Sequence, residues 1–117
     1  MKVWVLGSGS RGNATVIDIG STRVLVDAGF SSRELKRRLT TAGIAPESIE
    51  AVIVTHEHSD HMCGAARSSH RWSWSLHATA GTVHGAPELV EADVRTFDAG
   101  ATLAFGTMTL QTVPVSH

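Results

Sequence analysis

The sequence predicts a single α/β layered domain. Short apolar runs rich in β-branched residues recur along the 117 residues, and segments in which apolar residues have helical spacing lie between several of them. Strands interspersed with helices are typical of a sheet that packs against a helical layer. With 42% hydrophobic residues, the chain could form one core of modest size.

The first part of the chain predicts three strands. Residues 3–6 form a short strand ahead of a glycine-rich loop at 7–13. Residues 14–19 and 23–27 are apolar and β-branched, with a glycine-containing turn between them, which predicts a hairpin that leads into Asp27.

A helix is predicted after this hairpin. Ser31 or Ser32 can cap its N-terminus, Leu35 and Leu39 recur at helical spacing, and Gly43 ends it.

The remaining elements are assigned by the same patterns. They are a tight turn at 45–47, a strand at 51–54, a short helix at 62–70, a strand at 76–79, a partly helical segment at 82–90 and a final hairpin at 101–105 and 107–115. Trp72, Trp74 and Leu76 alternate with serines, which indicates that they pack on one face of a strand.

The most informative segment follows the fourth predicted strand. It begins at Thr55 and places four potential metal ligands, His56, His58, Asp60 and His61, within six residues. Imidazole and carboxylate are ligands that zinc and similar ions prefer. In an extended segment the first two histidines point the same way and can hold one ion, and the last two groups can reach a second. A polar loop that is merely rich in histidine gives no reason for this crowding, so we interpret the segment as a metal site.

The pattern His-x-His-x-Asp-His after an apolar strand resembles the signature of the metallo-β-lactamase-fold hydrolases. The sequences at 6–13, 25–29 and 113–117 are similar to the YycJ/WalJ branch of that superfamily, which is associated with nuclease activity on DNA. The resemblance implies an αββα sandwich in which residues 1–117 form the N-terminal half, a mixed sheet with helices on one face.

The resemblance also implies the roles of the ligands. His56, His58 and His117 would bind a first zinc ion, and Asp60 and His61 would bind a second, with catalysis depending on Asp60. The remaining ligands of the second ion would lie beyond residue 117. Two ions, with manganese as an alternative to zinc, would hold a bridging hydroxide and polarise the scissile bond.

Two further features could support such a site. Asp27 ends an apolar strand, where a carboxylate needs a partner; it could be an ordinary turn residue, or, as the resemblance implies, it could brace the ligand segment from outside the metal shell. Ser10 and Asn13 lie in the glycine-rich loop, which could hold a substrate phosphate or be a purely structural turn. The loop matches Gly-x-Gly-x-x-Gly, but strand-like residues follow it and argue against a dinucleotide site.

Charge and composition bear on partners and location. The formal net charge of −1 shows no overall basicity, so nucleic acid as the substrate is implied by the resemblance alone. The basic residues 33 and 36–38 indicate a solvated helix face, with phosphate steering as the alternative. The single Cys63 excludes an internal disulfide, and no apolar run is long enough to cross a membrane or to act as a signal peptide. We expect a cytoplasmic protein.

The length of the chain leads to a further expectation. Family members are longer, so we expect that the C-terminal half of the sandwich is absent. Val24, Val26, Val52 and Val54 are then expected to form an uncovered sheet face through which the chain could self-associate.

The leading functional hypothesis is metal-dependent hydrolysis of a phosphodiester in DNA, as by an exonuclease. A thioester hydrolase like glyoxalase II shares the ligand motif and is an alternative. A metallo-β-lactamase proper is disfavoured because the chain shows no export signal. A third alternative is a truncated half-domain that binds metal without turnover.

Overall fold

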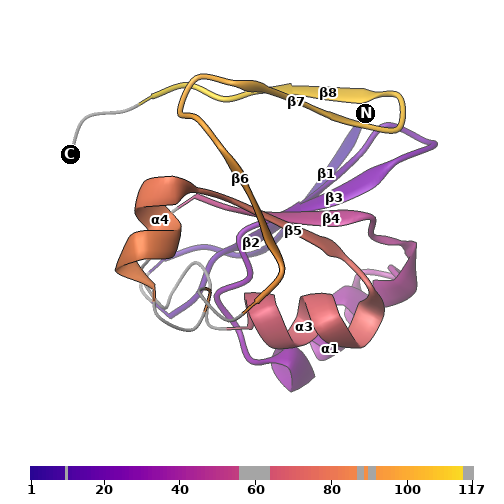
Figure 1. Cartoon of the computed structure of the whole chain (residues 1–117). Coiled ribbons are helices and arrows are strands. Elements are labelled where there is room, and N and C mark those ends of the chain that lie inside the picture. The colour runs from indigo at the N-terminus through magenta and orange to yellow at the C-terminus, as the bar shows by residue number, and fades with distance from the viewer. Residues whose placement is uncertain (10, 56–63, 87–88, 90–91, 115–117) are drawn as a thin grey trace.

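A computed structural model describes residues 1–9, 11–55, 64–86, 89 and 92–114 (Figure 1). In chain order the described elements are β1 (Lys2–Gly7), β2 (Ala14–Asp18), β3 (Arg23–Val26), α1 (Ser32–Thr41), the 3₁₀ turn η1 (Pro46–Ser48), β4 (Ala51–Val54), α3 (Ala65–Trp72), β5 (Ser75–Thr79), α4 (Ala80–Gly85), β6 (Val94–Phe97), β7 (Thr102–Phe105) and β8 (Met108–Gln111).

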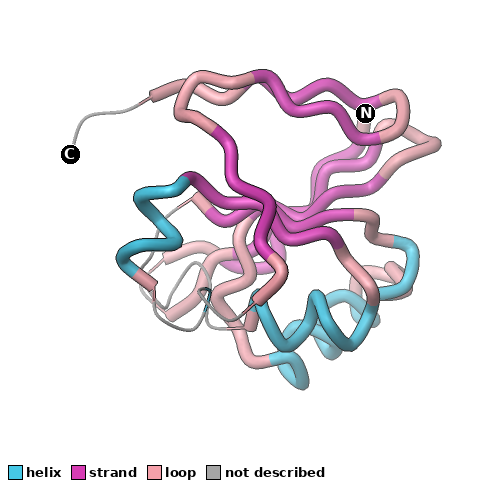
Figure 2. The backbone as a smooth tube through the Cα atoms, in the orientation of Figure 1, coloured by secondary structure: helices cyan, strands magenta, loops and turns pink. Residues whose placement is uncertain are grey.

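Six strands form one mixed sheet in the order β1-β2-β3-β4-β5-β6. The first three strands pair antiparallel, whereas β3, β4, β5 and β6 run parallel to their neighbours. Strands β7 and β8 form a separate antiparallel hairpin. Figure 2 shows the sheet as a central layer, with α1 and α3 below it and the hairpin above it. The predicted mixed sheet with helices on one face is confirmed.

Strand β4 is buried on both faces. Val52 and Val54 pack with the helices, and Ala51 and Ile53 pack with the β7–β8 hairpin. A short, continuous apolar run is typical of a parallel strand that is covered on both sides. The strand therefore holds its carboxyl end, where the predicted ligand segment begins, in a rigid frame.

Helix α1 has the ends that the sequence predicts. The Ser31 hydroxyl accepts a hydrogen bond from the Glu34 backbone N–H at 3.2 Å, which is the serine half of a capping box. At the other end Gly43 adopts a φ of 77°, and the N–H of Ile44 bonds back to the carbonyl of Leu39 at 2.9 Å. This left-handed closure favours glycine.

The expectation that Val24, Val26, Val52 and Val54 form one uncovered face is wrong, because they lie on opposite faces of the sheet. The parallel register pairs Val24 with Ala51, which places Val24 and Val26 on the hairpin side and Val52 and Val54 on the helix side. Val24, Val52 and Val54 are fully buried. On edge strand β1, Val3 and Val5 stay more than half exposed, and so does Val113 in the segment that leaves β8.

Other differences from the sequence-based assignment are local. Trp72 ends α3 instead of starting a strand, because Ser73 turns the chain in a left-handed conformation with φ of 59°. Trp74 is buried and its Nε1 donates to the Pro46 carbonyl at 2.8 Å. Strand β6 is not among the predicted elements, and β8 is shorter than predicted. None of the helices in the described part of the chain is both long and apolar enough to span a bilayer.

Candidate functional site

The candidate site lies at the carboxyl edge of the parallel strands. Asp27 directly follows β3, and Thr55 directly follows the neighbouring strand β4. Loops at this edge of a sheet commonly carry ligand sites in α/β folds. The predicted ligand segment begins at the residue after Thr55. The fold therefore places Thr55, which flanks that segment on its N-terminal side, at this edge.

Asp27 holds this flank by hydrogen bonds. Its Oδ1 accepts from the Thr55 backbone N–H at 2.8 Å and from the Thr55 hydroxyl at 2.9 Å, and Oδ2 lies 2.8 Å from the same hydroxyl. The Asp27 backbone N–H donates to the Ile53 carbonyl at 2.8 Å. Asp27 is only 7% exposed and adopts φ of 65°, a left-handed conformation that aspartate tolerates better than most residues. These contacts fix the carboxylate against the end of β4.

The other flank of the ligand segment rests on the same stretch of chain. The N–H of Gly64 donates to the Ala28 carbonyl at 2.9 Å. A Cβ atom at position 64 would overlap the Phe30 carbonyl oxygen, so only glycine permits this approach. Both flanks of residues 56–63 are therefore tied to the turn that follows β3.

The glycine-rich loop packs beside this turn. The ring of Phe30 occupies the space that a Cβ atom would take at Gly7 or Gly12. The Asn13 side chain accepts from the Gly9 N–H at 3.1 Å and donates to the Gly9 carbonyl at 2.9 Å, and the Asn13 carbonyl accepts from the N–H of residue 29 at 2.9 Å. The loop is thus closed on itself and joined to the turn that carries Asp27.

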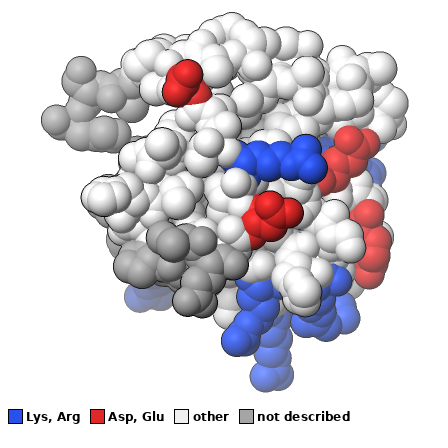
Figure 3. Space-filling view, viewed as in Figure 1, with Lys and Arg blue, Asp and Glu red and all other residues white. Residues whose placement is uncertain are grey.

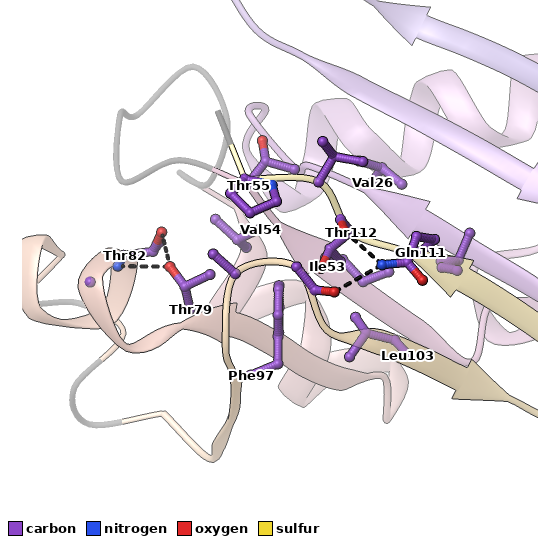
Figure 4. Close-up of a pocket in the computed structure, with 16 residues that line it drawn as sticks. Val26, Ile53, Val54, Thr55, Thr79, Thr82, Phe97, Leu103, Gln111 and Thr112 are labelled. Atoms are coloured by element: carbon purple, nitrogen blue, oxygen red, sulfur yellow. Dashed lines mark hydrogen bonds between the residues drawn. The ribbon is translucent and has the colours of Figure 1, made fainter. Parts of the chain in front are cut away.

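An open cleft of about 890 Å³ lies between the carboxyl edge of the sheet and the β7–β8 hairpin (Figure 4). Val26 and Thr55 line it from the sheet side, and Val113 and Pro114 line it from the segment that leaves β8. That segment is anchored because the Thr112 N–H donates to the Ala101 carbonyl at 3.0 Å. The chain that precedes the first predicted ligand and the chain that precedes the last one therefore face the same cleft.

The predicted site residues divide into two groups. Asp27 and Asn13 are described, and both belong to the turn and loop at the sheet edge. His56, His58, Asp60, His61, His117 and Ser10 lie outside the described residues. Among the described residues, no three His, Cys, Asp or Glu side chains gather closely enough to hold a metal ion.

The sequence patterns assign no role to Thr55, although it begins the motif. The structure makes it the partner of Asp27, 28 residues away in the chain. A hydroxyl residue at the junction between an apolar strand and a histidine-rich segment is the signal that could have identified it.

His77 lies away from this edge and packs against the hairpin. Its ring meets Phe105 edge-on at 4.9 Å, and its Nε2 lies 2.9 Å from the Ser75 hydroxyl. Burial, with a smaller contribution from Arg95, lowers the pKa of His77 below its usual value.

Comparison with known proteins decides the family. A sequence model of the metallo-β-lactamase superfamily matches residues 7–107, which is most of the chain. The chain belongs to this superfamily.

Within the superfamily, the chain is similar to proteins named as exodeoxyribonucleases. It is 31% identical to the exodeoxyribonuclease WalJ of Streptococcus pneumoniae, over 99% of this chain and 45% of that protein. It is 29% identical to the exodeoxyribonuclease YycJ of Bacillus anthracis, over 97% of this chain and 44% of that protein. The predicted resemblance to the YycJ/WalJ branch is confirmed, and the chain spans about half the length of these relatives.

The superfamily fold is confirmed by solved structures. A metallo-β-lactamase from Cronobacter sakazakii superposes with a TM-score of 0.78 at 19% identity, covering 95% of this chain and 50% of that one. At this identity the likeness concerns the fold alone. It extends across the sheet, the helical layer and the hairpin of this chain.

Members of the metallo-β-lactamase superfamily generally bind divalent metal ions, and the chemistry of this chain fits such ions. Three histidines and an aspartate within residues 56–61 supply the nitrogen and oxygen donors that zinc prefers. Asp27 anchors the flank of that segment, and a carboxylate that orients a ligand segment is a common feature around metal sites.

Proposed function

We propose that this chain forms part of a metal-dependent phosphodiesterase that degrades DNA from its ends. The observation that carries the proposal is the hydrogen-bonded pair of Asp27 and Thr55, which fixes Thr55, the residue before the His-x-His-x-Asp-His segment, at the edge of the sheet. The names of the bacterial relatives, which span nearly all of this chain, support DNA as the substrate.

The proposed ligand set follows the motif. His56, His58 and His117 hold the first ion, and Asp60 and His61 contribute to the second. When bound, two zinc or manganese ions activate the attacking water and stabilise charge on the leaving oxygen. Asp27 keeps the ligand segment in position through Thr55 and is a positioning residue, not a ligand.

The glycine-rich loop is proposed to contact a phosphate of the substrate through Ser10 and backbone N–H groups. Asn13 contributes by holding the loop closed through its two hydrogen bonds with Gly9. The loop packs beside the turn that carries Asp27, so a phosphate bound there would lie next to the proposed metal ligands.

The activity is tested with the protein expressed from its complete open reading frame. End-labelled duplex and single-stranded DNA are incubated with manganese or zinc, beside a thioester and a β-lactam. We expect release of nucleotides from linear DNA, resistance of covalently closed circular DNA, and loss of activity in a chelator. Cleavage of the thioester without degradation of DNA would assign the protein to the glyoxalase-like class. Metal binding without turnover of any substrate would support the non-catalytic alternative.

Self-association remains a separate proposal. Val3 and Val5 on edge strand β1 are 53% and 65% exposed, and an edge strand can pair with another chain. Sedimentation of the wild type and a Val3→Lys/Val5→Lys variant tests it, because only the wild type should form dimers or larger species.

A further inference from the structure

Positive charge is concentrated on two helices. Helices α1 and α3 carry six of the ten Lys and Arg residues and only one of the eleven Asp and Glu residues. Their formal charge is therefore +5, whereas the rest of the chain carries −6. We call the outer surface of α1 and α3 the helix layer. On the face seen in Figure 3, Lys and Arg gather at the lower side of the molecule, over these helices.

Two of the six cations serve the fold. Arg37 and Arg38 both bond Glu34, at 2.6 Å and 2.9 Å. Arg38 also donates to the Leu6 carbonyl at 2.5 Å and lies 4.1 Å from the centre of the Phe30 ring. Arg37 pairs within α1, whereas the contacts of Arg38 attach α1 to β1 and to the turn after β3.

The other four cations are exposed and form no ion pair with a carboxylate of the described residues. They are Arg33, Lys36, Arg67 and Arg71. The two helices lie side by side, because the buried hydroxyls of Ser32 and Ser68 bond at 2.7 Å. The four exposed cations therefore belong to two neighbouring helices.

The helix dipole favours Arg71, which lies in the last turn of α3 and 4.9 Å from the centre of the Trp72 ring, but it does not explain Arg33 or Arg67. Arg33 and Arg67 lie in the first turns of α1 and α3. The helix dipole disfavours a cation in the first turn, and no acidic residue occupies the first turn of α3 to offset it. Both first turns also lie next to the candidate site, since α1 starts shortly after Asp27 and α3 starts directly after Gly64.

A groove beside α3 extends this surface. It has a volume of about 920 Å³ and lies between α3 and strands β5 and β6. Arg67, His70 and Arg95 line it, together with Asp93 and Ser69. The Ser69 side chain is 7% exposed, and its hydroxyl finds no hydrogen-bond partner in the described structure. The guanidinium groups are donors suited to phosphate oxygens, whereas the Ser69 hydroxyl is buried beneath the groove surface.

We propose that the helix layer and this groove bind the phosphate backbone of nucleic acid, at a surface separate from residues 56–63. The inference rests on the proposed function for its choice of DNA as the partner. The contacts are electrostatic and independent of base sequence. A strand bound along the helix layer toward the first turns of α1 and α3 arrives at the candidate site, so the surface would hold the substrate between successive cleavages.

The test measures binding apart from turnover. The protein from the complete open reading frame is titrated into fluorescently labelled duplex DNA in the presence of a chelator. Two double variants, Arg33→Gln/Lys36→Gln and Arg67→Gln/Arg71→Gln, each remove two positive charges. The matched control is Lys2→Glu, which changes the net charge equally at an exposed position on β1 outside the helix layer. Arg67→Lys/Arg71→Lys keeps the charge.

We expect the DNA association constant of each double Gln variant to fall by at least about tenfold at roughly 0.1 M salt. Each lost phosphate contact lowers that constant, because fewer counterions are released on binding. The slope of log affinity against log salt should become shallower by roughly 2. Lys2→Glu and the Lys-for-Arg variant should bind nearly as the wild type does. Asp93→Asn, which removes a negative charge from the groove, should bind more tightly.

Three results would overturn the inference: no DNA binding by the wild type, equal weakening by Lys2→Glu, or variants impaired only in binding vesicles that contain anionic lipid. The inference and the proposed function can fail separately. Degradation of DNA with unaltered binding by the double variants removes the inference alone. Thioester hydrolysis accompanied by DNA binding through the helix layer removes the proposed function alone.

Discussion

The carboxylate of Asp27 receives both the backbone N–H and the hydroxyl of Thr55, at 2.8 Å and 2.9 Å through the same oxygen. The pair joins the carboxyl ends of β3 and β4 at the point where the ligand motif begins. A nearly buried carboxylate that accepts several hydrogen bonds stabilises both the local backbone and the chain beyond it.

Replacing Asp27 by Asn should weaken this junction without distorting it. Asn tolerates the left-handed φ of 65°, but its amide nitrogen cannot accept the bond from the Thr55 hydroxyl. We expect a loss of about 1–3 kcal/mol in the free energy of unfolding, and a lower zinc content. Urea denaturation and metal analysis measure the two effects. Asp98→Asn, at an exposed aspartate, is the control, and an equal loss there would count against the role of Asp27.

Metal binding should depend on the predicted histidines. For the 117-residue chain by itself, we expect about one zinc ion or fewer per chain after gel filtration, because three imidazoles suffice for a tetrahedral site with one water. The His56→Ala/His58→Ala double variant should lose that zinc. His84→Ala, at an exposed histidine of α4, should retain it. A double variant that keeps the wild-type zinc content would show that the metal binds elsewhere.

Asp60→Asn should separate the two proposed metal sites. The substitution keeps the shape of the side chain but weakens it as a ligand. Nucleotide release from DNA should fall at least about tenfold, while the zinc held by the three histidines stays bound. Unchanged release of nucleotides would refute the assignment of the second site.

Gly64→Ala should destabilise the fold, because the added Cβ atom would overlap the Phe30 carbonyl oxygen. We expect a cost of about 2 kcal/mol or more, measured by thermal or urea unfolding. Gly81→Ala is the matched control: no atom lies within 4 Å of its added Cβ, and it lies within α4. That variant should gain about 0.5–1 kcal/mol. Equal behaviour of the two would show that the close approach at Gly64 is unimportant.

His77 should lower the stability of the fold in acid. Burial lowers the pKa of His77, so the unfolded chain binds more protons than the folded chain as the pH falls through about 6.5. Its contribution is therefore intact above that pH and becomes unfavourable below it. His77→Gln should lose less stability than the wild type between about pH 7.5 and about pH 5.5 in urea unfolding. A steeper loss of stability in His77→Gln than in the wild type would show that His77 stabilises the fold in acid instead of destabilising it.

Local patterns predicted most of the fold. Strand β4 and the capped helix α1 could be recognised because a continuous apolar run and a capping serine act over a few residues. Strand β6 could not, because Val94–Phe97 includes Arg95 and Thr96, lies at the edge of the sheet and shows no alternation of burial. The alternation from Trp72 to Leu76 was misleading, since Ser73 breaks it with a left-handed turn.

The register between strands that are distant in the sequence could not be predicted from local sequence patterns. Val24, Val26, Val52 and Val54 look equivalent in the sequence, but the pairing of Val24 with Ala51 places the two pairs on opposite faces. The candidate ligands were chosen from the motif alone, and their assignment stays a prediction because residues 56–63 and 117 lie outside the described structure. The partnership of Asp27 with Thr55 depends on β3 and β4 being neighbours, which no short segment encodes.

The anchoring of both flanks of residues 56–63 has a consequence for the cost of metal capture. Thr55 is hydrogen-bonded to Asp27, and Gly64 is hydrogen-bonded to Ala28, which directly follows Asp27 in the chain. Bringing together the ends of an eight-residue segment costs roughly 2 kcal/mol of chain entropy. Folding of the sheet already brings these two ends together, so metal binding does not have to supply this entropy. Metal affinity should therefore decline with substitutions that loosen the turn after β3, even where they touch none of the ligands.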